Sequence, residues 1–160
     1  MSDPIIFYVP GEPKALKRHR SGKFGNYDPS KSDKADFLIV SRQHCPERPL
    51  IGPLYLYVDF YFQRPKSHYG TGKNAEKLKP TAPLYHIARP DADNLTKFVC
   101  DALNGVFWCD DAQIAQVQAT KKYVSDVGIG GYIGPGVAVE IGTLYNEGDE
   151  FFTLINKNPV

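Results

Sequence analysis

The sequence has little cysteine and no long apolar run, and both absences exclude whole classes of protein. Its 160 residues include three cysteines, Cys45, Cys100 and Cys109, and none belongs to a C-x-x-C pair. An odd, unpaired set of this kind argues against a disulfide framework and against a structural zinc site. No segment approaches the roughly 20 apolar residues of a membrane span, and the N-terminus lacks the regions of a secretory signal. We therefore expect a soluble, cytoplasmic protein whose thiols are reduced.

Several common catalytic and binding patterns are also missing. The four histidines have no metal-ligand spacing, and no serine or cysteine lies in a nucleophile-elbow pattern. The glycine-rich stretch at 128–136 does not fit G-x-G-x-x-G and precedes a strand rather than a helix, so we predict a hairpin loop there. The sequence thus offers no histidine-based zinc site, no serine or cysteine nucleophile and no dinucleotide-binding loop.

What the sequence does have is charge sorted by position along the chain, although the formal net charge is only +1. Residues 11–24 carry five Lys or Arg against one Glu, residues 64–89 carry six against one, and residues 91–111 carry five Asp against one Lys. An acidic centre between basic segments suits a metal-dependent enzyme that acts on a polyanion, because basic side chains hold phosphates while carboxylates hold the cation. The alternative is that both basic segments are solvated loops.

The length and the hydrophobic pattern predict one domain over residues 1–160. Residues 53–63 are expected to form a strand with both faces covered, because apolar and tyrosine-rich positions alternate along it without error. The other expected elements are strands at 5–9, 113–124 and 136–145 and helices at 30–44 and 93–106. This order gives an α/β or α+β domain with a mixed sheet and two main helices.

Three segments are expected to lie outside these elements. The chain from Gly11 to about Pro29 is predicted to be a long basic loop. Residues 63–88 hold three prolines and show no periodicity, which predicts a second long, mobile loop. The tail from Glu147 is acidic and is expected to be peripheral.

The segment from Arg89 to Leu95 places two carboxylates at the expected start of the second helix. Pro90 cannot continue a preceding helix and Asp93 is a natural N-cap, so Asp91 should lie in extended chain. Residues two apart point to the same side of an extended segment, which would let the two carboxylates converge on Mg²⁺ or Mn²⁺. The alternative for such a D-x-D pair is helix capping and complementation of the helix dipole.

Lys97 and the pair Asp110-Asp111 add to this acidic group. Lys97 belongs either to a surface ion-pair ladder with Asp93 and Asp101 or to a site where it stabilises a transition state at phosphorus. The two adjacent acids are either turn residues or part of the same site, since the strand after the helix must pack back near it. Three carboxylates and a lysine at one place are costly without a cation, because like charges repel, and this favours a site.

Residues 89–123 closely resemble the signature of the RusA family of Holliday-junction resolvases, whose pattern runs D-x-D-N-L-x-K, D-A-L, then D-D-x-Q-[IV] and a later lysine. Residues 10–13 and 17–20 also look like that family's opening strand and basic loop. The resemblance implies a Mg²⁺-dependent endonuclease with a small mixed α/β fold, acting as a homodimer on four-way DNA junctions, with Mn²⁺ expected to substitute. Carried over by position, it makes Asp91, Asp93 and Asp111 the metal-binding carboxylates and Lys97 the essential lysine. Lys121 aligns with a basic position downstream. The sequence departs from the family pattern in two places. Its 63–88 loop is long, and it has only Arg89 where some members carry an arginine cluster.

The expected reaction is hydrolysis of a phosphodiester, in which the carboxylates hold Mg²⁺, an activated water attacks phosphorus in line and Lys97 stabilises the added charge. Two identical sites related by a two-fold axis would provide the two matched nicks. The alternatives are a D-x-D metal-dependent transferase or phosphatase and a non-catalytic protein that binds branched DNA. The residues expected to hold the DNA are Lys14, Lys17, Arg18, Arg20, Arg89 and Lys121.

Overall fold

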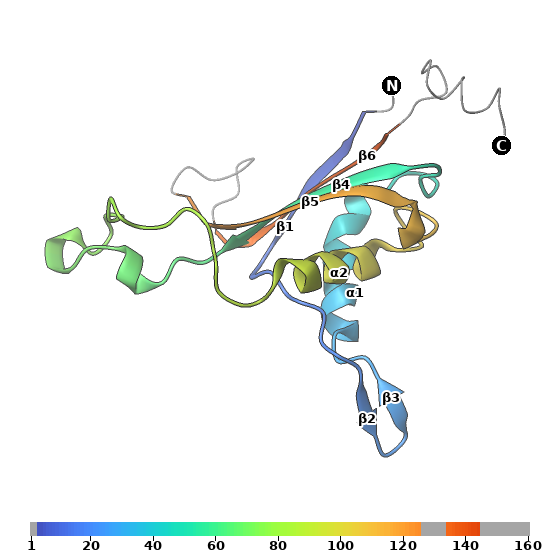
Figure 1. Cartoon of the computed structure of the whole chain (residues 1–160), viewed down its shortest axis with the longest axis horizontal. Coiled ribbons are helices and arrows are strands. Elements are labelled where there is room, and N and C mark those ends of the chain that lie inside the picture. Colours follow the sequence, from blue (N-terminus) through green and yellow to red (C-terminus); the bar gives the residue numbers. More distant parts are fainter. Residues whose placement is uncertain (1–2, 126–133, 145–160) are drawn as a thin grey trace.

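The computed structural model describes residues 3–125 and 134–144 (Figure 1). A four-stranded sheet runs through the molecule in the order β1-β6-β4-β5. β5 is parallel to β4, whereas β6 is antiparallel to both β1 and β4, so the predicted mixed sheet is confirmed. The strands are β1 (Ile5–Pro10), β4 (Leu54–Phe62), β5 (Ile114–Tyr123) and β6 (Gly136–Thr143).

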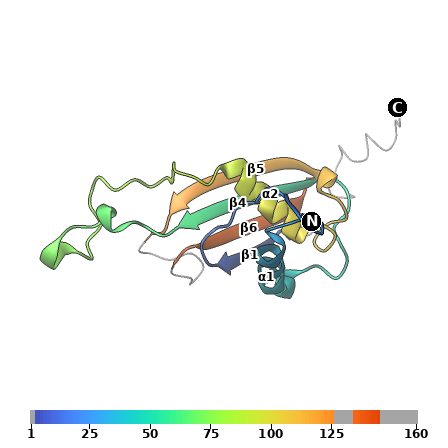
Figure 2. The ribbon, with the colours of Figure 1, turned by 90° about the horizontal axis from the view of Figure 1, so that it is seen from below.

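Two helices cover one face of this sheet, α1 (Lys31–Ser41) and α2 (Ala92–Leu103) (Figure 2). A short 3₁₀ turn, Arg42–His44, extends α1 to the predicted end of the first helix. α2 connects β4 to the parallel strand β5, which is the crossover that a parallel pair requires. The arrangement is a small single α+β domain, as predicted. None of the helices in the described ranges has the length and apolar composition that a membrane span needs.

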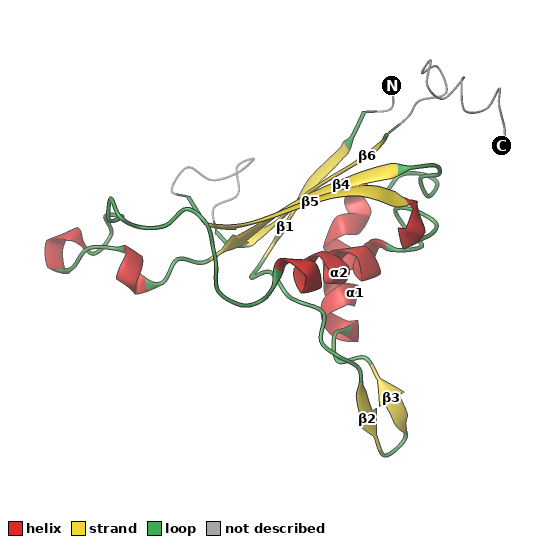
Figure 3. Ribbon diagram, in the orientation of Figure 1, coloured by secondary structure: helices red, strands yellow, loops and turns green. Residues whose placement is uncertain are grey.

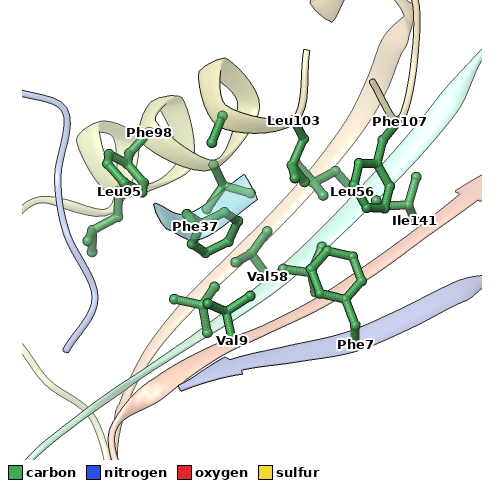
Figure 4. Close-up of a cluster of buried hydrophobic side chains, with 14 of the residues drawn as sticks. Phe7, Val9, Phe37, Leu56, Val58, Leu95, Phe98, Leu103, Phe107 and Ile141 are labelled. Carbon is green, nitrogen blue, oxygen red and sulfur yellow. The ribbon is translucent and has the colours of Figure 1, made fainter. Parts of the chain in front are cut away.

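The hydrophobic core lies between the helices and the sheet (Figure 4). The apolar stripe predicted for the second helix is buried, and each of its Leu, Phe and Val side chains stabilises the fold by roughly 1.5–3 kcal/mol relative to exposure. This stripe packs toward core residues of β1, β4 and β6, so the opposite stripe of α2 faces outward. The buried residues of α2 are Leu95, Phe98, Val99, Ala102 and Leu103.

The face of the sheet opposite the helices differs from the prediction. Tyr55 and Asp59 alternate with buried apolar residues along β4 and are half-exposed. Both helices of the described chain lie on the other face, so the prediction that both faces of β4 are covered is wrong. Tyrosine rings protect this face instead: Tyr55 packs over Gly142 and Tyr8 over Gly136, where any Cβ would collide with the ring. Alternation of large residues therefore indicated a strand but not what covers it.

The predicted basic loop between β1 and α1 contains a hairpin that the sequence analysis did not anticipate. β2 (Arg20–Gly22) pairs with β3 (Gly25–Tyr27), and the hairpin extends away from the sheet and the helices (Figure 3). Gly25 has φ of +114°, a conformation that favours glycine. Phe24, at the tip, is 98% exposed. The hairpin therefore presents its side chains to solvent rather than to the core.

The segment between β4 and α2 is a long loop, as predicted, with short 3₁₀ turns at Lys66–His68 and Gly72–Asn74. Arg64 lies at the base of this loop and is only 7% exposed. Its Nε donates to the carbonyl of Val124 at 2.8 Å, and its Nη1 donates to the carbonyl of Pro83 at 2.8 Å. A single arginine at the start of the loop thus ties Pro83 and the residue after β5 together. No local periodicity could have predicted this contact.

The connection from β5 to β6 also differs from the prediction. Residues 128–133 of the predicted hairpin loop lie outside the described residues, as does the predicted acidic tail from Glu147. β4 lies between β5 and β6 in the sheet, so these two strands do not form a hairpin. The prediction failed because it assumed that strands adjacent in sequence pair with each other.

Candidate active site and nucleic-acid interface

The N-terminal end of α2 carries the acidic residues that the sequence singled out. Asp91 is the N-cap, with extended backbone angles (φ −75°, ψ 147°), and its carbonyl accepts a hydrogen bond from the Leu95 amide at 3.1 Å. Its carboxylate makes no capping hydrogen bond. Asp93 is the second residue of the helix, so the prediction that it is the N-cap is wrong. The helix begins earlier because the chain enters it directly after Pro90, with Ala92 as a strong first helix former.

Asp91 and Asp93 border two different hollows. Asp91 borders one with Asn94, whereas Asp93 borders another, between α2 and β5, with Lys97 and Cys100. Asp91 has extended backbone angles whereas Asp93 is helical, so the two residues do not share one extended segment whose alternate side chains point the same way. The sequence analysis had placed Asp91 and Asp93 on the same side of extended chain, and the early start of α2 removes the basis for that expectation.

Lys97 is held at the surface by one weak contact. Its Nζ lies 3.8 Å from Oδ2 of Asp93, and the two side chains are 63% and 66% exposed. An ion pair at this exposure contributes little to stability. Asp101, the other member of the predicted ladder, pairs instead with Lys34 of α1 at 3.5 Å. Only the first half of the ladder is therefore present.

Asp111 lies after the C-terminal end of α2, in the 3₁₀ turn Asp111–Gln113 that Asp110 caps and that leads into β5. Its Oδ1 accepts a hydrogen bond of 2.7 Å from the indole Nε1 of Trp108, whose side chain is fully buried. Burial, and next the negative charge of Asp111, raise the pKa of the Cys100 thiol to about 12. Cys100 borders the same hollow as Asp93.

The described residues do not form a ready-made metal site. Within 3–125 and 134–144, no three His, Cys, Asp or Glu side chains are grouped so that they could hold one metal ion. The structure brings Asp93 next to Lys97 but does not gather Asp91, Asp93 and Asp111 at one point. The donor chemistry does fit Mg²⁺, since three exposed or half-exposed carboxylates supply hard oxygen ligands. Their assignment as metal ligands stays a prediction.

The basic residues near the hairpin fall into two groups. Lys14 and Lys17 both pair with Asp33 of α1, with Nζ to carboxylate distances of 2.5 and 3.4 Å. These lysines, chiefly the hydrogen bond from Lys14, hold the pKa of Asp33 below its ordinary value. Arg18 and Arg20 are exposed, and their side chains make no ion pair or hydrogen bond to any residue that the structure describes. The two arginines are therefore more available to an anionic ligand than Lys14 and Lys17, which are paired with Asp33.

The last two predicted DNA-binding residues lie near Asp91 in different states. Arg89 is exposed and borders the same hollow as Asp91. Lys121 is half-buried, and its Nζ donates to the carbonyls of Ala88 at 2.5 Å and Pro90 at 2.6 Å. Its ammonium is thus occupied by the protein's own backbone. A position in the sequence shows that a lysine is present but not that two distant carbonyls already hold it.

One structural feature was missed by the sequence analysis altogether. Lys23 was counted in the basic segment, but its place at the turn of a hairpin, between Gly22 and Gly25, was not foreseen. Two glycines flanking a two-residue turn are the signal that could have indicated it.

Comparison with known proteins agrees with the resemblance seen in the sequence. The family model described as "Endodeoxyribonuclease RusA" matches residues 10–131, which include both the basic segment before α1 and the acidic residues around α2. The chain is also similar to the uncharacterized protein YqaN of Bacillus subtilis (strain 168), with 38% identity over 132 residues, covering 76% of this chain and 89% of that protein. The chain belongs to the RusA family of endodeoxyribonucleases.

Proposed function

We propose that this chain is a Mg²⁺-dependent endodeoxyribonuclease that resolves four-way DNA junctions by paired symmetric nicks. The observation that carries the proposal is the exposed charged group at the start of α2, where the Asp91 carboxylate makes no capping bond and Asp93 meets Lys97 by one surface contact. Such a group contributes little to the fold. In a member of an endodeoxyribonuclease family, the same side chains supply the carboxylates and the cation that phosphodiester hydrolysis needs.

The residues at the start of α2, together with Asp111, have two kinds of role in the proposal. Asp91, Asp93 and Asp111 would hold Mg²⁺, and Mn²⁺ is expected to substitute. A bound divalent cation supplies Lewis-acid chemistry, which activates water and offsets charge on the phosphoryl group. Lys97 adds a compact, flexible positive charge that donates to a phosphate oxygen as negative charge develops there. The indole of Trp108 keeps one oxygen of Asp111 oriented and leaves the other available.

The hairpin and its surroundings are proposed to hold the DNA. Arg18 and Arg20 would contact phosphates directly, and Arg89 would do so beside Asp91. Lys14 and Lys17 would exchange their shared carboxylate, Asp33, for phosphate oxygens. Contacts of this kind position a duplex arm without reading its sequence.

We further propose that the active form is a homodimer. A four-way junction has approximate two-fold symmetry, and two identical sites related by a two-fold axis would cut two opposing strands in the same way. One chain with one site would leave the second strand to a separate binding event.

The test is to incubate a labelled four-way junction and a linear duplex with the protein, in Mg²⁺ or in EDTA. The proposal expects nicking of the junction in Mg²⁺, none in EDTA and little cleavage of the duplex. Binding of the junction without cleavage in Mg²⁺ or Mn²⁺ would support the non-catalytic alternative. Absence of both binding and cleavage would leave the D-x-D transferase or phosphatase alternative, and equal cleavage of the duplex would remove the selectivity for junctions.

A further inference from the structure

Lys121 occupies an unusual place in the sheet. The register of β4 and β5 pairs Lys121 with Phe60 and the neighbouring Tyr123 with Phe62, on the side of the sheet that the helices cover. A lysine in such a row loses hydration and needs hydrogen-bond acceptors in return. The next residue, Lys122, points to the opposite face, where it pairs with Asp59 at 3.1 Å. The two adjacent lysines therefore meet different surroundings.

The acceptors of Lys121 are backbone atoms that lead directly to Asp91. Its Nζ donates to the carbonyls of Ala88 and Pro90, at 2.5 and 2.6 Å, and these carbonyls lie on either side of Arg89. Pro90 is followed at once by Asp91, the N-cap of α2. One ammonium thus fixes the last extended residues before the helix begins.

The same stretch of chain is also tied to the backbone of β5. The amide of His86 donates to the carbonyl of Lys121 at 3.0 Å, and the amide of Tyr123 donates to the carbonyl of Leu84 at 2.9 Å. These bonds hold residues 84–86 beside the end of β5, but they stop before Asp91. Between His86 and Asp91, the described hydrogen bonds that anchor this segment to β5 are the two from the Lys121 side chain.

We propose that Lys121 is a positioning residue that holds Asp91 in place for the metal site, rather than a contact to DNA. The inference rests on the proposed function, because it assigns Asp91 to that site. To reach a phosphate, the ammonium would have to release both carbonyls, and charge-assisted bonds of this length are the stronger kind. Removing the ammonium frees the segment that carries Asp91 while leaving β5 and the core unchanged.

The experiment compares Lys121→Met with Lys122→Met, a matched control that removes a lysine from the opposite face of the same strand. The first measurement is Mn²⁺ binding to the DNA-free protein by titration calorimetry. Lys121→Met should weaken Mn²⁺ binding at least fivefold, whereas Lys122→Met should leave it within twofold of wild type. Lys121→Arg should recover part of the loss, since a guanidinium can also donate to two carbonyls.

A double-mutant comparison shows whether Lys121 acts through Asp91. Asp91→Asn should itself weaken Mn²⁺ binding, and adding Lys121→Met in that background should cause no further loss. Hydrogen exchange of the metal-free protein gives a second readout, in which amides of residues 89–95 exchange faster in Lys121→Met and not in Lys122→Met. Binding of a four-way junction in Ca²⁺ should stay within twofold of wild type in both lysine variants.

The outcomes separate this inference from the proposed function. If wild-type protein binds Mn²⁺ and cuts the junction, but Lys121→Met binds Mn²⁺ normally and loses junction affinity with a shallower salt dependence, then Lys121 is a DNA contact and the inference is overturned. If losses from Lys121→Met and Asp91→Asn simply add, the inference is also overturned. Failure of wild-type protein to bind Mn²⁺ or to cut the junction would overturn the proposed function, and with it this assignment.

Discussion

Charged side chains lie both at the start of α2 and at the base of the loop between β4 and α2 (residues 63–91). They are exposed at the first place and buried at the second. At the loop base, Arg64 is 7% exposed and donates to two backbone carbonyls. At the start of α2, Asp93 and Lys97 are about two-thirds exposed and meet at 3.8 Å. The difference shows which charges hold the chain together and which remain available. We infer that the available ones serve the reaction.

The β2–β3 hairpin and the segment that leads into it resemble the start of α2 in this respect. Arg18 and Arg20 lie in solvent, unpaired among the residues that the structure describes. Lys14 and Lys17 are intermediate, because both share one partially exposed carboxylate, Asp33. Variants of each group should therefore separate into those that reduce activity, those that reduce stability and those that reduce DNA binding.

The largest expected effect is on the carboxylates. Asp91→Asn, Asp93→Asn and Asp111→Asn should each reduce single-turnover cleavage of a four-way junction by on the order of 10³-fold or more, since each removes a proposed ligand of the catalytic cation. Junction binding measured in Ca²⁺ should be retained or become tighter as negative charge is lost. Near-normal turnover in any one of the three would remove that residue from the metal site.

Lys97 should show the same pattern with a smaller effect. Lys97→Ala should lower the cleavage rate by roughly 10²-fold, the scale for removing one preorganised charge stabiliser. The free energy of unfolding should change by well under about 1 kcal/mol, because its only described ion pair is exposed. Lys97→Arg should also lose activity, since the planar guanidinium does not replace a point charge aimed at one oxygen. Wild-type rates in both variants would return Lys97 to the role of a surface ion pair.

Arg64 should show the opposite pattern. Arg64→Ala removes a buried cation and leaves two carbonyls without their donor, so we expect thermal or denaturant unfolding to show a loss of about 2–4 kcal/mol. Arg20→Ala, at an exposed position, is the matched control and should stay within about 0.5 kcal/mol. If the two variants unfold alike, the contrast between occupied and available cations does not hold.

Arg18, just before the hairpin, and Arg20, its first residue, should affect binding rather than chemistry or stability. Arg18→Ala and Arg20→Ala should each weaken binding to any DNA and reduce the slope of log K against log salt by about 0.7–0.9. Arg42→Ala, at the far end of α1, removes an exposed charge of the same kind and should leave the slope unchanged. An unchanged slope in the Arg18/Arg20 double variant would exclude the hairpin from the interface.

The smallest expected effect is at Asp33. Asp33→Asn should release Lys14 and Lys17 and tighten DNA binding by a few-fold, because neither lysine then has to exchange a carboxylate for phosphate. The measurement is a binding titration at low and moderate salt. Weaker binding in this variant would show that Asp33 orients the two lysines toward DNA instead of competing for them.

Much of the fold could be predicted because its signals are local. The alternation along β4 and the apolar stripe of α2 each repeat over several turns or pairs, and both elements were placed correctly. The hairpin was missed because strands of three residues are too short to show a period. The N-cap was misplaced by two residues because Asp91 and Asp93 are equally good capping types.

The sequence proposes members for the candidate site, and they stay a prediction, whereas the geometry of the site could not be predicted. The spacing of acids and lysine predicted Asp91, Asp93, Lys97 and Asp111 as a group, whereas the structure has Asp91, Asp93 and Lys97 in the first turns of α2 and Asp111 in the turn between α2 and β5. Which side of α2 each acid takes depends on where the helix begins. Lys121 is held by the carbonyls of Ala88 and Pro90, which lie more than thirty residues away in the chain. Both are long-range or boundary properties that a residue pattern does not encode.

Mapping the nicks on all four strands of a labelled junction, under single-turnover conditions in Mg²⁺, is the measurement that tests the central claim most directly. The account predicts cuts at two symmetric positions on opposing strands in wild-type protein, and no cuts in Asp91→Asn at a concentration where the same variant binds the junction fully. Cuts that persist in Asp91→Asn, or a junction that wild-type protein binds in Mg²⁺ and leaves intact, would contradict it.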